Sequence, residues 1–174
     1  MERSLNKILE ESFRKNWDKA ALSDFKGITL HYRDVARRIE KLHIIFNICG
    51  VQKGDRIAIC SRNQANWGVV FLASLTYGAV PVPILHEFKP GNVHHIVNHS
   101  DSRVLSESEM PNLEAIILID DFSLLMSRSE QITDTRERLN EMFGKKYPKS
   151  FGPGDINYHE EDSGEELAMI NYTS

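Results

Sequence analysis

Apolar residues recur with helical spacing in several segments of the chain, and each of these segments predicts a helix with one buried face. Residues 35–49 carry the longest stripe, and Gly50 follows it as a helix terminator. Residues 65–79 are apolar nearly all round, which indicates a helix that is covered on most sides. The four one-sided stripes are Leu5, Ile8, Leu9 and Phe13; Val35, Ile39, Leu42, Phe46 and Cys49; Val93, Ile96, Val97 and Ser100; and Ile132, Leu139, Met142 and Phe143.

Short apolar runs between these helices predict strands. Two runs around Lys26-Gly27 predict a β-hairpin, and single strands are expected at 56–60, 79–85, 103–105, 114–120 and 167–172. Pro81 and Pro83 cannot donate hydrogen bonds to a neighbouring strand. Their strand should therefore be short, lie at an edge, or pair in a pattern that skips both prolines. Strands that alternate with helices predict an α/β fold with a wound, mainly parallel sheet flanked by helices.

The remaining segments and the composition narrow the class of protein. Residues 148–166 are rich in proline, glycine and acidic residues and predict a loop, while the helix over residues 131–147 has a charged outer face. The formal net charge of −4 gives no support to a nucleic-acid-binding protein. No run reaches the ~18 apolar residues of a membrane span, and the charged N-terminus does not resemble a secretory signal, so a cytoplasmic protein is expected. Cys49 and Cys60 are interpreted as two buried thiols.

Two histidines and a pair of aspartates are the first candidates for metal-binding residues. His95 and His99 have the i, i+4 spacing of two metal ligands, but neither a glutamate between them nor a nearby cysteine or carboxylate cluster completes a site. A polar helix face is the favoured interpretation, and no metal ligand is assigned. Asp120-Asp121 follows a predicted strand without a glycine loop before it, which favours a turn over a magnesium site. His31 is expected to mark a helix start.

A cluster of three lysines, Lys145, Lys146 and Lys149, is too small to argue for phosphate or lipid binding. The end of the chain is more informative. Thr173 and Ser174 follow a predicted strand, and ligands of α/β sheets bind at the carboxyl ends of strands. If glycines followed, backbone N–H groups and both hydroxyls could point at phosphate oxygens.

Four segments, read in order, resemble the N-terminal part of the adenylate-forming (AMP-binding) superfamily, which contains the acyl-CoA synthetases. They are "ITLHYRDVARRIEKL", "GVQKGDRIAICSRNQANWGVVFLASLTYGAVPVPI", "FKPGNVHHIVNHSDSRVL" and "ELAMINYTS". The long apolar helix before Gly78 and "MPNLEAIILIDD" are most similar to the long-chain fatty acid–CoA ligase branch. The resemblance implies that residues 1–174 are the N-terminal portion of the AMP-binding domain, truncated at the start of its phosphate loop.

The resemblance also implies a reaction. A fatty acid carboxylate would attack the α-phosphate of ATP to give an acyl-adenylate, and the thiol of coenzyme A would then displace AMP, with Mg²⁺ offsetting phosphate charge. Thr173 and Ser174 match the opening of the phosphate loop, and Tyr172 matches the strand residue before it. No residue of this chain matches a catalytic residue or a metal ligand of the family. The fragment alone is therefore expected to be inactive.

Several alternatives stay open at this point. The substrate of the full-length protein can be another carboxylate, such as an aryl acid or an amino acid, or the chain can be a non-enzymatic α/β interaction domain. Small molecules (fatty acid, ATP and coenzyme A) are the expected partners, and peripheral membrane contact is possible for long-chain substrates. The stretch from residue 103 to 115 is shorter than in the family, through either a deletion or residues missing from the sequence.

Overall fold

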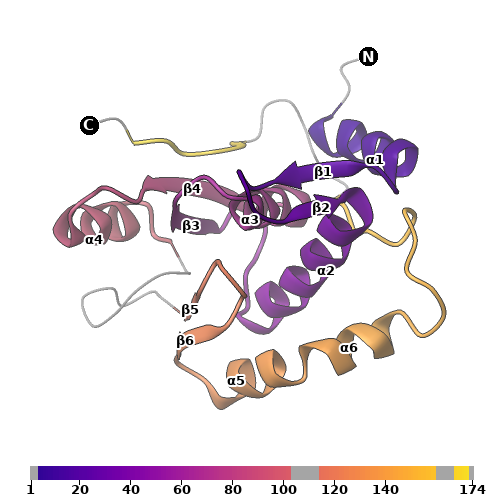
Figure 1. Cartoon of the computed structure of the whole chain (residues 1–174). Helices are drawn as coiled ribbons and strands as arrows, with labels where there is room; N and C mark the ends of the chain where they lie inside the picture. Colours follow the sequence, from indigo (N-terminus) through magenta and orange to yellow (C-terminus); the bar gives the residue numbers. More distant parts are fainter. Residues whose placement is uncertain (1–3, 103–113, 160–166, 173–174) are drawn as a thin grey trace.

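The computed structural model describes residues 4–102, 114–159 and 167–172, and a parallel βαβ unit lies at its centre (Figure 1). Strands β3 (Arg56–Ser61) and β4 (Val80–Leu85) pair in parallel, and helix α3 (Ala65–Tyr77) connects them. Ser102 forms a further parallel bridge to Arg56, on the edge of β3 that faces away from β4. The predicted α/β fold, with helices around a parallel sheet, is confirmed.

The two prolines of β4 lie on the edge of that strand that faces away from β3. The N–H of Val80 donates to the carbonyl oxygen of Asp55 at 2.8 Å, so the even-numbered residues of β4 pair with β3. Because neighbouring residues of a strand point their backbone groups to opposite sides, Pro81 and Pro83 leave the ladder to β3 intact. The pairing therefore follows the pattern that skips both prolines.

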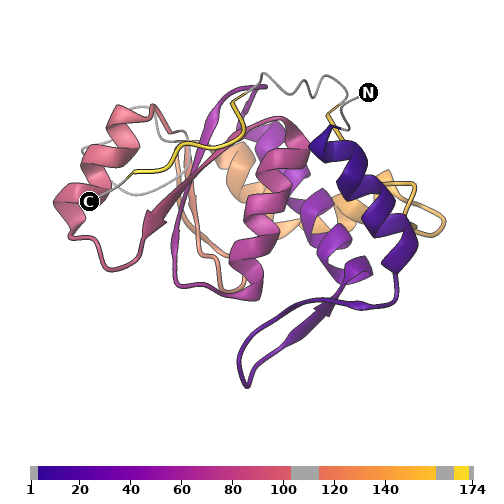
Figure 2. The same ribbon diagram turned by 90° about the horizontal axis from the view of Figure 1, so that it is seen from above.

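The prediction of a strand over residues 167–172 is wrong. This segment lies beside β4 and runs in the same direction (Figure 2), but with the described residues it makes a single backbone hydrogen bond, from the N–H of Ile170 to the carbonyl oxygen of Pro81 at 3.2 Å. The prolines explain the irregular backbone. They leave only carbonyl acceptors on this part of the β4 edge, and a regular ladder needs both donors and acceptors.

Helix α2 (Tyr32–Ile48) buries the whole apolar stripe predicted for residues 35–49 and packs against α3. Its N-cap is His31, whose N–H donates to Asp34 Oδ2 at 3.0 Å, so the prediction that this histidine marks a helix start is confirmed. Gly50 follows the helix with φ of 69°, the left-handed conformation that commonly ends helices.

The N-terminal elements form as predicted, although one helix face differs. Helix α1 (Leu5–Asn16) is capped by Ser4, and β1 (Ala20–Ser23) pairs antiparallel with β2 (Thr29–His31). Of the apolar stripe on α1, Phe13 is 2% exposed, whereas Leu5 and Ile8 are exposed. The buried face of α1 is completed by the polar side chain of Asn6.

The part of the chain after β4 follows the prediction less closely. Helix α4 (Pro90–His99) buries Ile96, Val97 and the following Ser100 as expected. The strand predicted over residues 103–105 falls outside the described residues. Only Ala115–Ile117 of the strand expected over 114–120 is regular (β5), and it pairs antiparallel with β6 (Leu124–Ser127), a strand that sequence analysis missed.

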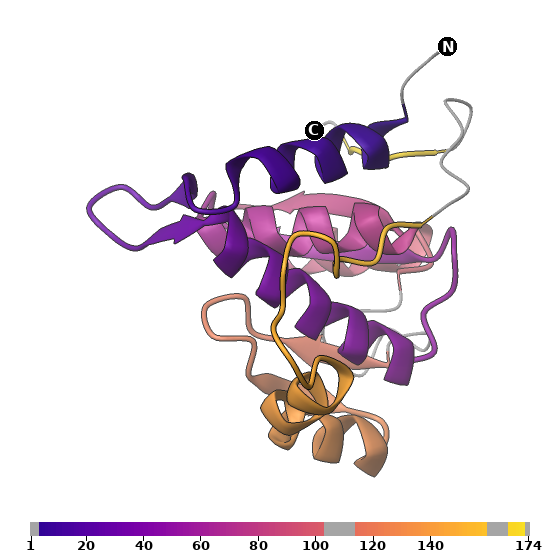
Figure 3. The same ribbon diagram turned by 90° about the vertical axis from the view of Figure 1, so that its right-hand side faces the viewer.

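The single helix predicted over residues 131–147 is two helices, α5 (Glu130–Glu137) and α6 (Leu139–Lys146), which are separated at Arg138. Ile132 and Leu139 are buried, whereas Met142 and Phe143 are half-buried. Both helices contact α2, and Figure 3 shows them below it, with α1 on the far side of the molecule. The break allows the two pieces to follow α2 at different angles.

Two apolar clusters hold these layers together. The larger cluster joins α1, α2 and α3 to Ile57 and Ile59 of β3, and the smaller one joins Ala58, Val82 and α4 to Ile116. Cys49 is buried and Cys60 half-buried, neither is in a disulfide with a described residue, and burial raises the pKa of the Cys60 thiol. Within the described ranges, no helix is long and apolar enough to cross a bilayer.

Gly78, the left-handed residue between α3 and β4, supplies a stability test. Its φ is 84°, and a Cβ atom at this position would lie 2.8 Å from Cγ of His159. We expect Gly78→Ala to lower the free energy of unfolding by about 1–3 kcal/mol, through left-handed backbone strain and this close contact. Gly91→Ala is the control, because that helical glycine has open space around it. Equal urea midpoints for wild type and Gly78→Ala would contradict the structure.

Candidate nucleotide-loop site and the Glu40 cluster

Tyr172 is the one predicted site residue within the described part of the chain, and it is held by helix α4. The hydroxyl of Tyr172 lies 2.8 Å from Nδ1 of His99, the last residue of α4. The two rings also meet edge to face, with their centroids 5.7 Å apart. Thr173 and Ser174, the other two predicted residues, lie outside the described residues.

The segment that leads to Tyr172 is anchored on the parallel sheet. Ile170 and Tyr172 pack against the smaller apolar cluster, which includes Val82 of β4 and Ile96 of α4. This segment runs in the same direction as β4, so it leads towards the carboxyl end of the parallel strands (Figures 1 and 2). Ligands of open α/β sheets bind at that end. The position of Tyr172 is therefore compatible with a loop that binds phosphate immediately after it.

The other candidates for chemistry have ordinary structural roles. The rings of His95 and His99 are 5.7 Å apart at their centroids, and within the described ranges no group of three or more potential ligands is placed to share a metal ion. The turn predicted at Asp120-Asp121 is confirmed. Asp121 Oδ1 accepts the N–H of Ser123 at 2.8 Å, and the hydrogen bonds from Ser123 hold the pKa of Asp121 below its usual range.

A buried polar cluster surrounds Glu40 of α2, a residue that sequence analysis did not select. Its carboxylate is fully buried. Oε2 accepts hydrogen bonds from Tyr147 Oη at 2.5 Å and Lys146 Nζ at 2.9 Å. Asn157 donates twice, from its backbone N–H to Oε1 at 2.6 Å and from Nδ2 to Oε2 at 3.0 Å. His43 Nδ1 lies 3.4 Å from Oε1.

These contacts keep Glu40 ionised. Burial by itself raises the pKa of a carboxyl group, but the hydrogen bonds and the charge around Glu40 outweigh it. The hydrogen bonds from His43, Tyr147 and Asn157, together with the charge interaction with His43, lower the pKa of Glu40 to about 2. Burial, together with the negative charge of Glu40, raises the pKa of Tyr147. At neutral pH Glu40 is therefore a charged acceptor and does not supply a proton, which suits a structural role.

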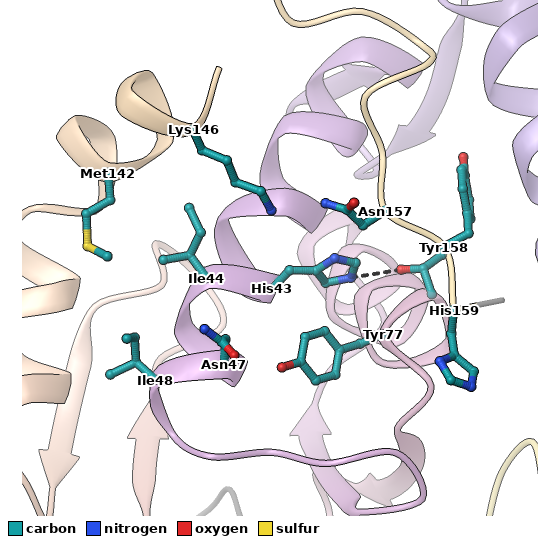
Figure 4. A pocket seen from close by; sticks show the side chains of 11 residues that line it. His43, Ile44, Asn47, Ile48, Tyr77, Met142, Lys146, Asn157, Tyr158 and His159 are labelled. Atoms are coloured by element: carbon teal, nitrogen blue, oxygen red, sulfur yellow. Dashed lines mark hydrogen bonds between the residues drawn. The ribbon is translucent and has the colours of Figure 1, made fainter. Parts of the chain in front are cut away.

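A cavity of about 480 Å³ opens beside this cluster, between α2, the end of α3, α6 and residues 157–159 (Figure 4). His43 lines the cavity, and its Nε2 lies 3.0 Å from Thr76 Oγ1 and 3.1 Å from the carbonyl oxygen of Ala73. Lys146 and Asn157, which also line the cavity, are both bonded to Glu40. Lys146 and Asn157 thus fasten the chain from α6 onwards to Glu40 of α2, whereas Tyr158 Oη and His159 Nε2, which also line the cavity, have no hydrogen-bond partner among the described residues.

Comparison with known proteins identifies the family. The sequence profile of the AMP-binding enzymes matches residues 9–174. This chain belongs to the AMP-binding enzyme family. Fatty acyl-CoA synthetase A of Dictyostelium discoideum is 28% identical to it over 158 residues, which cover 87% of this chain and 23% of that protein.

Two solved structures show the same fold. A long-chain-fatty-acid–CoA ligase, FadD1 of Archaeoglobus fulgidus, superposes with a TM-score of 0.69 and 18% identity, and covers 99% of this chain. The anthranilate–CoA ligase AuaEII, in complex with anthranoyl-AMP, superposes with a TM-score of 0.68 and 21% identity, and also covers 99%. The chain spans 35% and 31% of these two structures. The resemblance to adenylate-forming enzymes is confirmed for family and fold.

Proposed function

We propose that the full-length protein activates a carboxylic acid with ATP and transfers the acyl group to coenzyme A. The match of the AMP-binding enzyme profile to residues 9–174 carries this proposal. In the first step a carboxylate oxygen bonds to the α-phosphorus of ATP and pyrophosphate leaves. In the second step the sulfur of coenzyme A bonds to the acyl carbon, its proton is released, and AMP leaves. Residues 1–174 then form the N-terminal portion of the AMP-binding domain.

Residues 172–174 have separate roles in this proposal. The hydroxyls of Thr173 and Ser174 begin the phosphate loop and donate hydrogen bonds to phosphate oxygens of ATP, where charge develops as pyrophosphate leaves. Tyr172 precedes the loop, and its hydrogen bond to His99 fixes the direction in which the chain leaves the sheet. Mg²⁺ would neutralise phosphate charge, but the described residues provide no ligand group for it. No step is therefore assigned to a metal held by this part of the chain.

A long-chain fatty acid is the proposed substrate. The Dictyostelium relative, a fatty acyl-CoA synthetase, aligns with 87% of the chain and supports this choice. An aryl acid is the second candidate, because the anthranilate–CoA ligase superposes almost as well as FadD1. The non-enzymatic interaction domain is disfavoured by the family match. The 174-residue chain alone is proposed to be inactive, since it spans about a third or less of these relatives.

Formation of acyl-CoA by the full-length protein tests the substrate. The protein is incubated with ATP, coenzyme A and one carboxylic acid at a time, including palmitate, octanoate, anthranilate and an amino acid. Product thioesters are then measured by mass spectrometry. Palmitoyl-CoA as the main product is the expected result. If anthranilate is preferred, the proposed substrate becomes an aryl acid instead of a fatty acid. If no acid gives a thioester, the proposed transfer to coenzyme A is contradicted.

A further inference from the structure

A second hollow, far from Tyr172, is lined by three basic residues that form no ion pair with a carboxylate of the described residues. It has a volume of about 410 Å³ and lies between α2, α5, the start of α6 and the turn at residues 120–122. Arg38 and Lys41 of α2 and Arg136 of α5 line it, and Arg37 lies nearby on α2. In Figures 1 and 3, α5 and segment 167–172 lie on opposite sides of the molecule. The hollow is therefore separate from the proposed nucleotide loop.

The basic residues of the hollow differ in their partners from five other basic residues of the described chain. Arg14, Arg33, Arg138, Lys145 and Lys146 each have a carboxylate oxygen within 3.0 Å. Across residues 4–102, 114–159 and 167–172, no such ion pair is formed by the three cations of the hollow or by Arg37. The structure thus gathers four positive charges, none of which is in an ion pair with a described carboxylate, although the charge of Asp121 attracts that of Arg136.

Neutral acceptors hold these side chains in place without cancelling their charge. Lys41 Nζ donates to Asn140 Oδ1 at 2.7 Å, and Arg38 donates to Asn66 Oδ1. Arg136 donates to the backbone carbonyl oxygens of residues 121 and 122. Burial lowers the pKa of Lys41, and repulsion from the three neighbouring arginines lowers it further. A bound anion would relieve this repulsion.

Two carboxylates lie on the wall of the hollow, but both have hydrogen-bond partners of their own. Asp120 Oδ1 accepts Gln64 Nε2 at 3.0 Å, and Asp121 Oδ1 accepts the N–H of Ser123 at 2.8 Å. Neither forms an ion pair with a basic side chain of the hollow within the described ranges. The cations outnumber these carboxylates, so the hollow as a whole attracts negative charge.

We propose that this hollow, with Arg38, Lys41 and Arg136 as its ligands, binds a phosphate-bearing anion. Guanidinium groups match the oxygens of phosphate in two-point contacts, and lysine adds a point charge, so this set of side chains suits a phosphate group better than a single carboxylate. The volume is large enough for a pyrophosphate or for the phosphate end of a larger molecule. The phosphate can belong to a soluble molecule or to a lipid headgroup.

Binding of pyrophosphate to the 174-residue chain tests this site. Only two residues of the proposed nucleotide loop are present in this chain, so failure here and failure of the proposed function are distinguishable. We expect Arg38→Gln/Lys41→Gln/Arg136→Gln to weaken pyrophosphate binding about tenfold or more in isothermal titration, because three charge-assisted contacts are lost. The control, Arg14→Gln/Arg138→Gln/Lys145→Gln, removes the same charge from residues that already have carboxylate partners. Its affinity should change less than about twofold.

A second experiment distinguishes a soluble phosphate ligand from a lipid headgroup. Sedimentation with phosphatidylcholine vesicles, with and without phosphatidic acid, measures lipid binding by the full-length protein and both triple variants. Pyrophosphate binding that the hollow variant loses supports a soluble ligand. Binding only to phosphatidic acid vesicles, again lost in the hollow variant, supports a lipid headgroup. No binding in either arm, or equal loss in both triple variants, would overturn the proposal.

Discussion

Replacing Glu40 with alanine is expected to lower the free energy of unfolding by about 3–5 kcal/mol, the range found when one partner of a buried ionic network is removed. The carboxylate is fully buried and accepts hydrogen bonds from Lys146, Tyr147 and Asn157. Without it, these donors lose their common acceptor, and the chain after α6 loses its main polar attachment to α2. Urea denaturation at pH 7 measures the change.

Glu141→Gln is the matched control for this prediction. Glu141 also has a pKa lowered to about 2, in its case by hydrogen bonds from Arg138 and Lys145, but its side chain is exposed to solvent. Exposed ion pairs contribute little to stability, so the urea midpoint of this variant should stay close to that of wild type. A Glu40→Ala protein as stable as the control would contradict the role assigned to the cluster.

The same cluster sets a dependence of stability on pH. The pKa of Glu40 falls from its ordinary value of 4.5 to about 2 in the folded protein, so folding favours the ionised form. Its contribution is therefore complete above pH 4.5 and is lost as the pH falls from there towards 2. The stability difference between wild type and Glu40→Gln should shrink over this window, which denaturation at several pH values can follow.

Removing both hydroxyls of the proposed phosphate loop is expected to have the largest effect on activity. In the full-length protein, Thr173→Ala/Ser174→Ala should lower kcat/KM for ATP by about 10- to 100-fold or more, because two donors to phosphate oxygens are lost. Steady-state formation of acyl-CoA at varied ATP measures the change. An unchanged kcat/KM would show that the loop begins elsewhere.

A hydroxyl on another surface controls for non-specific effects. Thr133 is exposed on α5, so Thr133→Ala should leave both kcat/KM and the melting temperature unchanged. The loop variant should also melt like wild type, since it removes only two small polar groups. A loss of activity accompanied by an equal loss of stability would point to misfolding instead of weakened ATP binding.

The elements that were predictable from sequence are those whose periodicity is set by burial on one side. The stripe of α2 fits this rule, and the run of β3 was predictable as a short continuous apolar segment that is buried on both faces. Elements decided by tertiary context were not predictable. The strand β6 has four residues and no alternating pattern, and the irregular course of residues 167–172 follows from prolines that lie some ninety residues earlier.

The polar cluster around Glu40 could not be predicted from the sequence, because it too depends on tertiary contacts. Glu40 sits between Ile39 and Lys41 in a charged stretch that resembles a solvated helix face, and its partners Tyr147 and Asn157 are more than 100 residues away. One local signal was present. Ala36, Glu40 and His43 follow one another at i, i+4 and i+7, and all three are buried, so they form a second inward stripe on α2.

Exchange of labelled pyrophosphate into ATP is the most direct test of the central claim, that this chain belongs to an enzyme that adenylates a carboxylate. The reaction contains the full-length protein, ATP, labelled pyrophosphate and a carboxylic acid, without coenzyme A. The account predicts label in ATP only when a suitable acid, foremost a long-chain fatty acid, is present. Absence of exchange with every acid of a broad panel, from a folded full-length protein, would contradict it.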